Sequence, residues 1–180
     1  MARHGDETPG RIFALGALSG VFYALLFMNI LGGSSEKVKV PTFNAGFLAN
    51  PVPLGGGEVS SGFGWRADPI SGFRDFHNGI DIPCSGNVPV YAPVGGRVLQ
   101  AGYKGKGGRE ILIRARGGWH VGLSHLAGFR KGVRPGSRVN QGEMIGWCGE
   151  SGYAKGLHVH FTLHGPDGRV KDPHDFNMNE

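Results

Sequence analysis

The chain has 180 residues, which is enough for one ordinary domain with short additional segments. Its 34 glycines and 11 prolines are spread between short Val, Ile, Leu and Phe runs, which excludes a low-complexity chain and favours a β-rich domain with many tight turns. The formal net charge is +5, and the excess lies between Arg97 and Arg138, where ten Lys or Arg residues accompany one acid, Glu110. Such a segment is either a solvated basic surface or a site of attraction for an acidic polymer or an anionic membrane. No nucleic-acid-binding motif accompanies it, so we do not expect nucleic acid as a partner.

The first predicted element is a membrane-spanning helix over residues 12–31, after a polar stub of residues 1–11. The sequence IFALGALSGVFYALLFMNIL runs for 20 residues without a charge, about the length that crosses a bilayer as a helix. A cleaved signal peptide is the alternative, but its apolar region is usually about 7–15 residues long, and no A-x-A site follows. We therefore predict a single-pass transmembrane signal anchor. Arg3 and Arg11 balance Lys37 and Lys39, so the positive-inside rule leaves its orientation open.

Residues 32–52 are rich in Gly, Ser and Pro and are predicted to be a linker, followed by one domain over residues 53–180. In this domain turn signals alternate with short apolar runs, and no segment of useful length has a 3.6-residue period. We expect an all-β, sandwich-like domain of antiparallel sheets joined by Gly-rich loops. The predicted strands cover residues 79–82, 88–91, 97–101, 110–114, 121–126, 143–147 and 157–163.

The last of these strands carries the strongest functional pattern. In LHVHFTLH, residues 157–164, apolar residues alternate with His158, His160, Thr162 and His164. A period of two is typical of a half-buried strand, so His158 and His160 project from the same face with Cα atoms about 7 Å apart. Two imidazoles at that separation can serve one small site, where one binds a metal ion and the other handles a proton.

A second pattern is His77-Asn78-Gly79-Ile80-Asp81. In a straight strand His77 and Asp81 would lie about 13 Å apart, but Gly79 permits a bulge or bend that shortens this distance. With one histidine of the H-x-H pair they would make three nitrogen and oxygen ligands, the number that holds zinc in catalytic sites. The alternative is that Asp81 caps a turn and His77 lies in solvent.

The ordered set of motifs resembles the lysostaphin/LytM-type zinc endopeptidases of peptidoglycan. The resemblance extends from about Ser60 to Phe176 and rests on these segments, in the family's order: SSGFGWRADPISGFRDFHNGIDIP, PVYAPVGGRV, SHL (124–126), GSRVNQGEMIGWCGESG, LHVHF and KDPHDF. Two positions depart from the family's pattern: Leu123 stands where relatives often carry tyrosine, and Arg114 to Arg116 replace a commoner pattern that ends in histidine. These departures concern substrate preference rather than the metal site.

The resemblance implies one zinc ion per chain, with His77, Asp81 and His160 as its ligands and His125 and His158 as the catalytic pair. Zinc can lower the pKa of a coordinated water to about 7, and histidine, with a pKa near 6.5, can take up a proton and return one to a leaving amine. Which histidine is the general base is left open.

The remaining candidate residues are less specific. Cys84 and Cys148 are the only cysteines and both could flank the site; outside the cytoplasm such a pair tends to form a disulfide, whereas two separate buried thiols are the alternative. Arg66 is a candidate for the substrate groove or a plain surface arginine. The histidines His120, His164 and His174 are interpreted as peripheral.

Three functions fit these patterns. The first is a membrane-tethered zinc endopeptidase that cuts peptide stems or cross-links of peptidoglycan, with its peptidase domain on the extracytoplasmic side and residues 1–11 inside the cell. The second is a non-catalytic wall-binding or hydrolase-activating module of the same fold. The third is a wall-opening component of an envelope-spanning or phage assembly.

Overall fold

The computed structural model describes residues 51–52 and 56–175. By the density of internal contacts the chain divides into two units, Met1–Lys39 and Val40–Glu180, and all described residues belong to the second. The predicted stub, the predicted anchor and the linker up to residue 50 lie outside the described residues. Within the described part of the chain, no helix has the length and apolar character needed to cross a membrane.

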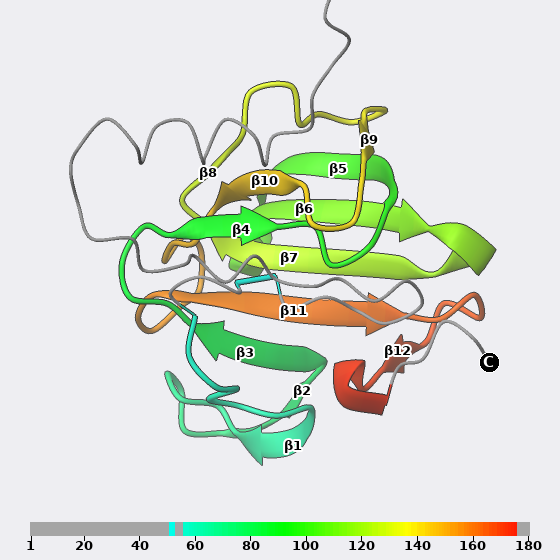
Figure 1. Ribbon diagram of the computed structural model, residues 1–180. Helices are drawn as coiled ribbons and strands as arrows, with labels where there is room; N and C mark the ends of the chain where they lie inside the picture. The colour runs from blue at the N-terminus through cyan, green and yellow to red at the C-terminus, as the bar shows by residue number, and fades with distance from the viewer. Residues whose placement is uncertain (1–50, 53–55, 176–180) are drawn as a thin grey trace, which may run out of the picture. The chain divides into compact units, whose positions relative to one another are not determined.

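A seven-stranded sheet forms the main layer, and it confirms the prediction of an all-β domain. Its strands are ordered β12-β11-β7-β6-β5-β9, with β3 also paired to β11, and all of these pairs are antiparallel. Figure 1 shows β5, β6, β7, β11 and β3 side by side in this order. The bounds are β3 Gly79–Pro83, β5 Gly96–Lys104, β6 Gly108–Ala115, β7 His120–Leu126, β9 Arg138–Val139, β11 His158–His164 and β12 Val170–Lys171.

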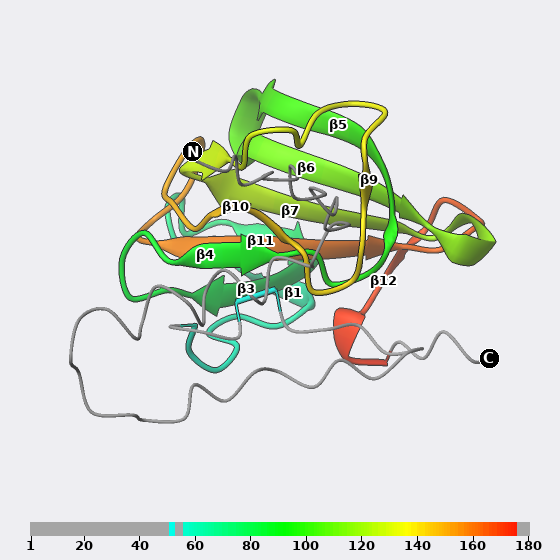
Figure 2. The same cartoon turned by 45° about the horizontal axis from the view of Figure 1, so that its top comes forward.

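Two smaller sheets accompany the main one. Strands β4 (Pro89–Tyr91), β10 (Met144–Trp147) and β8 (Gly128–Phe129) make a three-stranded sheet, and β1 (Gly64–Ala67) pairs with β2 (Arg74–His77) in a hairpin. In Figures 1 and 2, β4 and β10 lie over one face of the large sheet. The described helical segments are short 3-10 turns, at Gly105–Gly107, Arg116–Gly118 and Pro173–Asp175.

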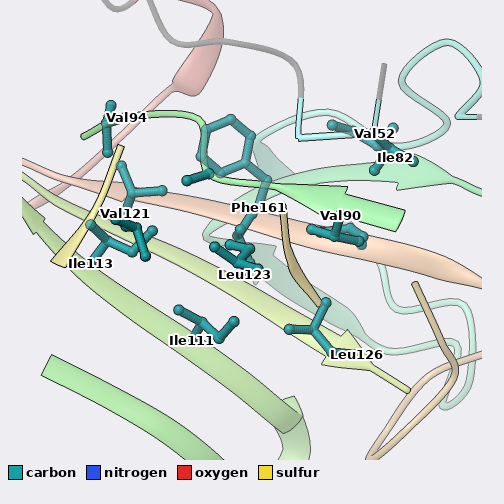
Figure 3. Packing of buried hydrophobic residues seen from close by; sticks show 14 of the residues in the cluster. Val52, Ile82, Val90, Val94, Ile111, Ile113, Val121, Leu123, Leu126 and Phe161 are labelled. Carbon is teal, nitrogen blue, oxygen red and sulfur yellow. The ribbon is translucent and has the colours of Figure 1, made fainter. Parts of the chain in front are cut away.

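The hydrophobic core fills the space between the two larger sheets. Val90 of β4, Ile111 of β6, Leu123 of β7 and Phe161 of β11 are all at most 3% exposed, and Figure 3 shows them in one cluster. Full burial of a Val, Leu, Ile or Phe side chain contributes about 1.5–3 kcal/mol, so this layer dominates the stability of the domain. Val52, at the end of the predicted linker, is also fully buried in this core.

The other face of the large sheet is open. The alternation of side chains along each strand determines which residues lie on this open face. On β11, Val159, Phe161 and Leu163 are buried in the core, so the residues between them face the open side. Every strand expected from the sequence is present within a few residues. The β1–β2 hairpin and the two-residue strands β8, β9 and β12 were not predicted, because they lack a regular apolar alternation.

Candidate active site

The three predicted metal ligands converge on the open face of the large sheet. His160 on β11 lies directly opposite Asp81 on β3, and His77 ends β2 just before β3 begins. Asp81 Oδ1 lies 2.8 Å from His160 Nδ1 and 3.1 Å from His77 Nε2. The two ring nitrogens are 3.0 Å apart although 83 positions separate the residues. The fold therefore collects one carboxylate and two imidazoles at a single point.

The hydrogen-bond partner on the far side of each imidazole ring fixes which ring nitrogen carries the hydrogen. His77 Nδ1 lies 2.7 Å from the carbonyl oxygen of Gly62, and because a carbonyl only accepts, Nδ1 must donate. In the same way His160 Nε2 donates to Oδ1 of Asn78 at 3.0 Å. In the neutral form each ring would thus turn its lone-pair nitrogen toward Asp81, in the arrangement that metal-binding histidines adopt.

This donor set fits a divalent metal ion. Three acceptor atoms at these distances repel one another unless a positive charge lies among them, either a second proton on a ring or a bound cation. Ligands held about 2.1 Å from a tetrahedral zinc ion lie about 3.4 Å from one another, close to the separations found here. These three residues can all offer a ligand atom within 4.8 Å of the others.

Asp81 is held ionised by its surroundings. Burial raises the pKa of its carboxyl group, but when the rings of His160 and His77 are protonated, their hydrogen bonds to Oδ1 and their positive charge outweigh burial and hold the pKa well below its usual range. The second carboxylate oxygen, Oδ2, accepts from Arg66 Nη2 at 3.4 Å. Arg66 therefore lies in the groove, where it holds the carboxylate of Asp81 from the side opposite the histidines.

The short path from His77 to Asp81 is made by a corner rather than by a bulge. Strand β2 ends at His77, β3 begins at Gly79, and Asn78 lies between them. Gly79 has an ordinary backbone conformation, but a Cβ at this position would collide with the carbonyl oxygen of Phe161 and lie 3.0 Å from the ring of His160. The glycine is needed because β3 and β11 approach each other closely beside the ligands.

His125 and His158 form a second pair beside the cluster of His77, Asp81 and His160. Their ring centroids are 4.7 Å apart, and His158 Nε2 lies 3.8 Å from Asp81 Oδ1. Both rings donate through Nδ1 to a main-chain carbonyl, that of Ser151 at 2.8 Å for His125 and that of Gly156 at 2.9 Å for His158. In the neutral form each therefore presents an unprotonated Nε2 that can accept a proton. Burial lowers the pKa of His125, and the nearby His158 and His160 add to the effect.

A β-bulge places His125 on this face. On β7, Ser124 lies opposite His160, so an unbroken strand would put His125 opposite Val159 and point it into the core. Instead, Leu126 pairs with Arg109 while Leu123 pairs with Ile111, which leaves one extra residue on β7. His125 has a φ of 64°, and this left-handed conformation turns its side chain to the open face.

A groove of about 930 Å³ runs along the open face and contains the five predicted site residues and Arg66. His164 lies at its margin, four residues along β11 from His160, and His120 lies opposite His164 on β7. His174 is exposed, in the last 3-10 turn. Cys84 and Cys148 form a disulfide with Cα atoms 6.6 Å apart, which joins the chain just after β3 to the chain just after β10.

Comparison with known proteins identifies the family of this chain. The model of peptidase family M23 matches residues 75–173, more than half of the chain. The chain belongs to peptidase family M23. The DD-carboxypeptidase/endopeptidase Mpg of Neisseria meningitidis is 34% identical over 126 residues, which are 70% of this chain and 28% of that protein. The glycyl-glycine endopeptidase ALE-1 of Staphylococcus capitis is 34% identical over 102 residues, 56% of this chain and 28% of that one.

A solved relative supports the same assignment. The catalytic domain of lysostaphin from Staphylococcus simulans superimposes with a TM-score of 0.58 at 28% identity, over 65% of this chain and 89% of that domain. The resemblance drawn from the sequence motifs is thereby confirmed. This chain, however, spans only about a quarter of the length of the two sequence relatives above.

The M23 match contains His77, Asp81, His125, His158 and His160, whereas Arg66 lies before it. Asn78, whose amide orients His160, was not predicted from the sequence. Its position inside the H-x-x-x-D motif, next to a ligand, was the available signal. The three carbonyl groups that orient the other rings gave no signal, because every residue has one.

Proposed function

We propose that the chain is a zinc-dependent endopeptidase that hydrolyses peptide stems or cross-links of bacterial peptidoglycan. The observation that carries the proposal is the convergence of His77, Asp81 and His160, each ring with its lone pair turned to the carboxylate. Membership of the M23 family, and the endopeptidase names of both sequence relatives, support the same activity. The two names differ in the bond that they imply, so the bond cut by this chain is left unassigned.

In this proposal His77, Asp81 and His160 hold the zinc ion. Bound zinc would polarise the scissile carbonyl and lower the pKa of a water molecule to about 7. Arg66 keeps Asp81 in position through Oδ2, while Gly62 and Asn78 keep the rings in the ligand tautomer. The negative carboxylate and two neutral imidazoles make a site with a net charge of +1 when a divalent ion is present.

His125 and His158 are the proton carriers of the proposed reaction. Each offers an unprotonated Nε2 to the groove, so either can take a proton from the attacking water and afterwards donate it to the leaving amine. The other ring, once protonated, can donate to the oxygen on which negative charge develops. Because burial keeps the pKa of His125 low, this residue is neutral at pH 7 and ready to accept.

We further propose that residues 12–31 anchor the chain in the cytoplasmic membrane with the domain on the extracytoplasmic side. The length and apolarity of that segment support the anchor, and the location of the proposed substrate supports the orientation. A membrane-bound enzyme of this kind would act on wall within reach of its linker, alone or as part of a larger envelope or phage assembly.

The test uses the full chain, purified in detergent and loaded with zinc, on purified peptidoglycan. Mass spectrometry of the soluble products should reveal new amine and carboxyl ends, and a chelator should stop their appearance until zinc is restored. His160→Ala should lose zinc, whereas His158→Ala should keep zinc and lose hydrolysis. Normal metal content and turnover in His160→Ala would refute the ligand assignment. Wall binding without new ends in the zinc-loaded chain would favour the non-catalytic module instead.

A further inference from the structure

A row of basic side chains crosses the open face of the large sheet, beyond the candidate active site. Strand register places Arg138 of β9 opposite Arg97 of β5, Arg97 opposite Arg114 of β6, and Arg114 opposite His120 of β7. His120 in turn lies opposite His164 of β11. We call these five residues the basic row. The basic row cannot be recognised from neighbouring positions in the sequence, because its five residues lie on five different strands.

The basic row lies on the same face as the metal ligands. Val98 and Ile113 are fully buried in the core, so Arg97 and Arg114 beside them face the other way. His164 is four residues from His160 along β11, about 13 Å. The large groove reaches His164, and a second hollow of about 590 Å³ is lined by Arg97, Arg114 and Arg138.

Like charges on directly opposite residues destabilise a sheet, and nothing in the described residues relieves them here. Arg97, Arg114 and Arg138 are exposed, and none of them forms an ion pair or a side-chain hydrogen bond within residues 51–52 and 56–175. The single acid between Arg97 and Arg138, Glu110, is hydrogen-bonded to Gln100 and Ser124. The row therefore keeps unneutralised positive charge at one end of the groove.

We propose that the basic row binds carboxylate groups of the wall peptide whose bond is cut. This inference rests on the proposed function for the identity of the polymer. Guanidinium groups match the planar carboxylate with two parallel hydrogen bonds, and adjacent strands space the three arginines about 4.8 Å apart, so neighbouring residues can share one anion. Continuity of the row with the groove favours an acid on the substrate itself over an acid on another molecule.

The geometry also sets where the carboxylate must lie on the substrate. Between the metal ligands and the row, the face is formed by Thr162, Gly122 and Leu112, aligned across β11, β7 and β6. Gly122 has no side chain there, and the space that a Cβ would take is occupied by Oγ1 of Thr162, so the side chain of Thr162 lies across this part of the face. Arg114 lies two strands from β11, so it is about 16 Å from His160. An extended peptide covers that distance in about five residues, and the recognised acid belongs about that far from the cut bond.

The experiment compares binding of acidic and neutral wall fragments to the full chain carrying His158→Ala, which prevents turnover. Fluorescently labelled soluble fragments of purified peptidoglycan are used as prepared and after conversion of their carboxylates to amides, and Kd is measured by fluorescence anisotropy. The unmodified fragments should bind about tenfold more tightly, a ratio that should shrink as salt is added. Arg97→Gln/Arg114→Gln should bring the ratio close to one.

The matched control is Lys131→Gln/Arg134→Gln, which removes the same charge from exposed positions of the same basic segment outside the row. It should keep the preference for unmodified fragments. Equal binding of both fragments, or equal loss in both variants, would overturn the proposal. A phosphodiester wall polymer that displaces the fragments and itself depends on Arg97 and Arg114 would also overturn it. If the preference holds but no bond is ever cut, the proposed hydrolase activity fails and the row stands.

Discussion

Loss of the disulfide between Cys84 and Cys148 should destabilise the domain by an amount that follows from the loop it closes. The two cysteines are 64 positions apart in the sequence. In the chain-entropy model a loop of that length corresponds to about 4 kcal/mol of stabilisation at 25 °C, because the bridge restricts the unfolded chain. For a domain of this size that amounts to a fall in Tm of about 12–20 °C.

Thermal and urea unfolding of the oxidised chain, the reduced chain and Cys84→Ala/Cys148→Ala measures this effect. The reduced chain and the double variant should both lose most of the stabilisation of about 4 kcal/mol that the disulfide provides. The double variant should lose slightly more, because Cys148 is fully buried and alanine removes its packing contacts.

The single variants Cys84→Ala and Cys148→Ala supply the control, since either one already removes the bridge. The loss in Cys148→Ala should be close to that of the double variant, and the loss in Cys84→Ala should be slightly smaller because Cys148 keeps its packing contacts; the two losses should not add up to that of the double variant. A loss below about 1 kcal/mol on reduction would refute the entropic reasoning, and would mean that the unfolded chain already holds this loop together.

Three further predictions concern the site. Gly79→Ala should lower stability by about 1–3 kcal/mol and weaken zinc binding, because its methyl group would separate β3 from β11 at Phe161 and His160; unchanged zinc affinity by chelator competition would contradict this. Asn78→Ala should weaken zinc binding about 10- to 100-fold by freeing the His160 ring, and Asn78→Asp should restore much of it; equal affinity of all three chains would exclude the orienting role. Since burial holds the pKa of His125 below its ordinary 6.5, hydrolysis should persist as the pH falls to about 6.5 and decline only below it; a half-maximal rate clearly above that pH would argue against His125 as the proton acceptor.

The sequence alone was sufficient to predict side-chain orientation where a single strand carried the whole pattern. Strict alternation in β11 correctly put His158 and His160 on one open face and Phe161 in the core. The spacing of His77 and Asp81 indicated a shared site, although the corner at Asn78 and the close approach at Gly79 were not foreseen. A close approach of two strands depends on the partner strand, and no local pattern encodes it.

Features made by register between strands could not be predicted. The alternation of β7 alone would bury His125 beside Val121 and Leu123, and only the bulge reverses this. The alignment of Arg97 with Arg114 likewise depends on how β5 and β6 pair after their own register shift. The sequence showed that basic residues are frequent between Arg97 and Arg138, but only the pairing of the strands aligns some of them in the basic row.

The hydrogen bonds that orient the site's histidines place little constraint on the side chains of the neighbouring loops. Three of the four ring N–H groups donate to main-chain carbonyls, which are retained whatever side chain the residue carries. At Gly62, moreover, an added Cβ would meet open space. The groove walls can therefore accumulate substitutions while the orientation of the four histidine rings stays intact.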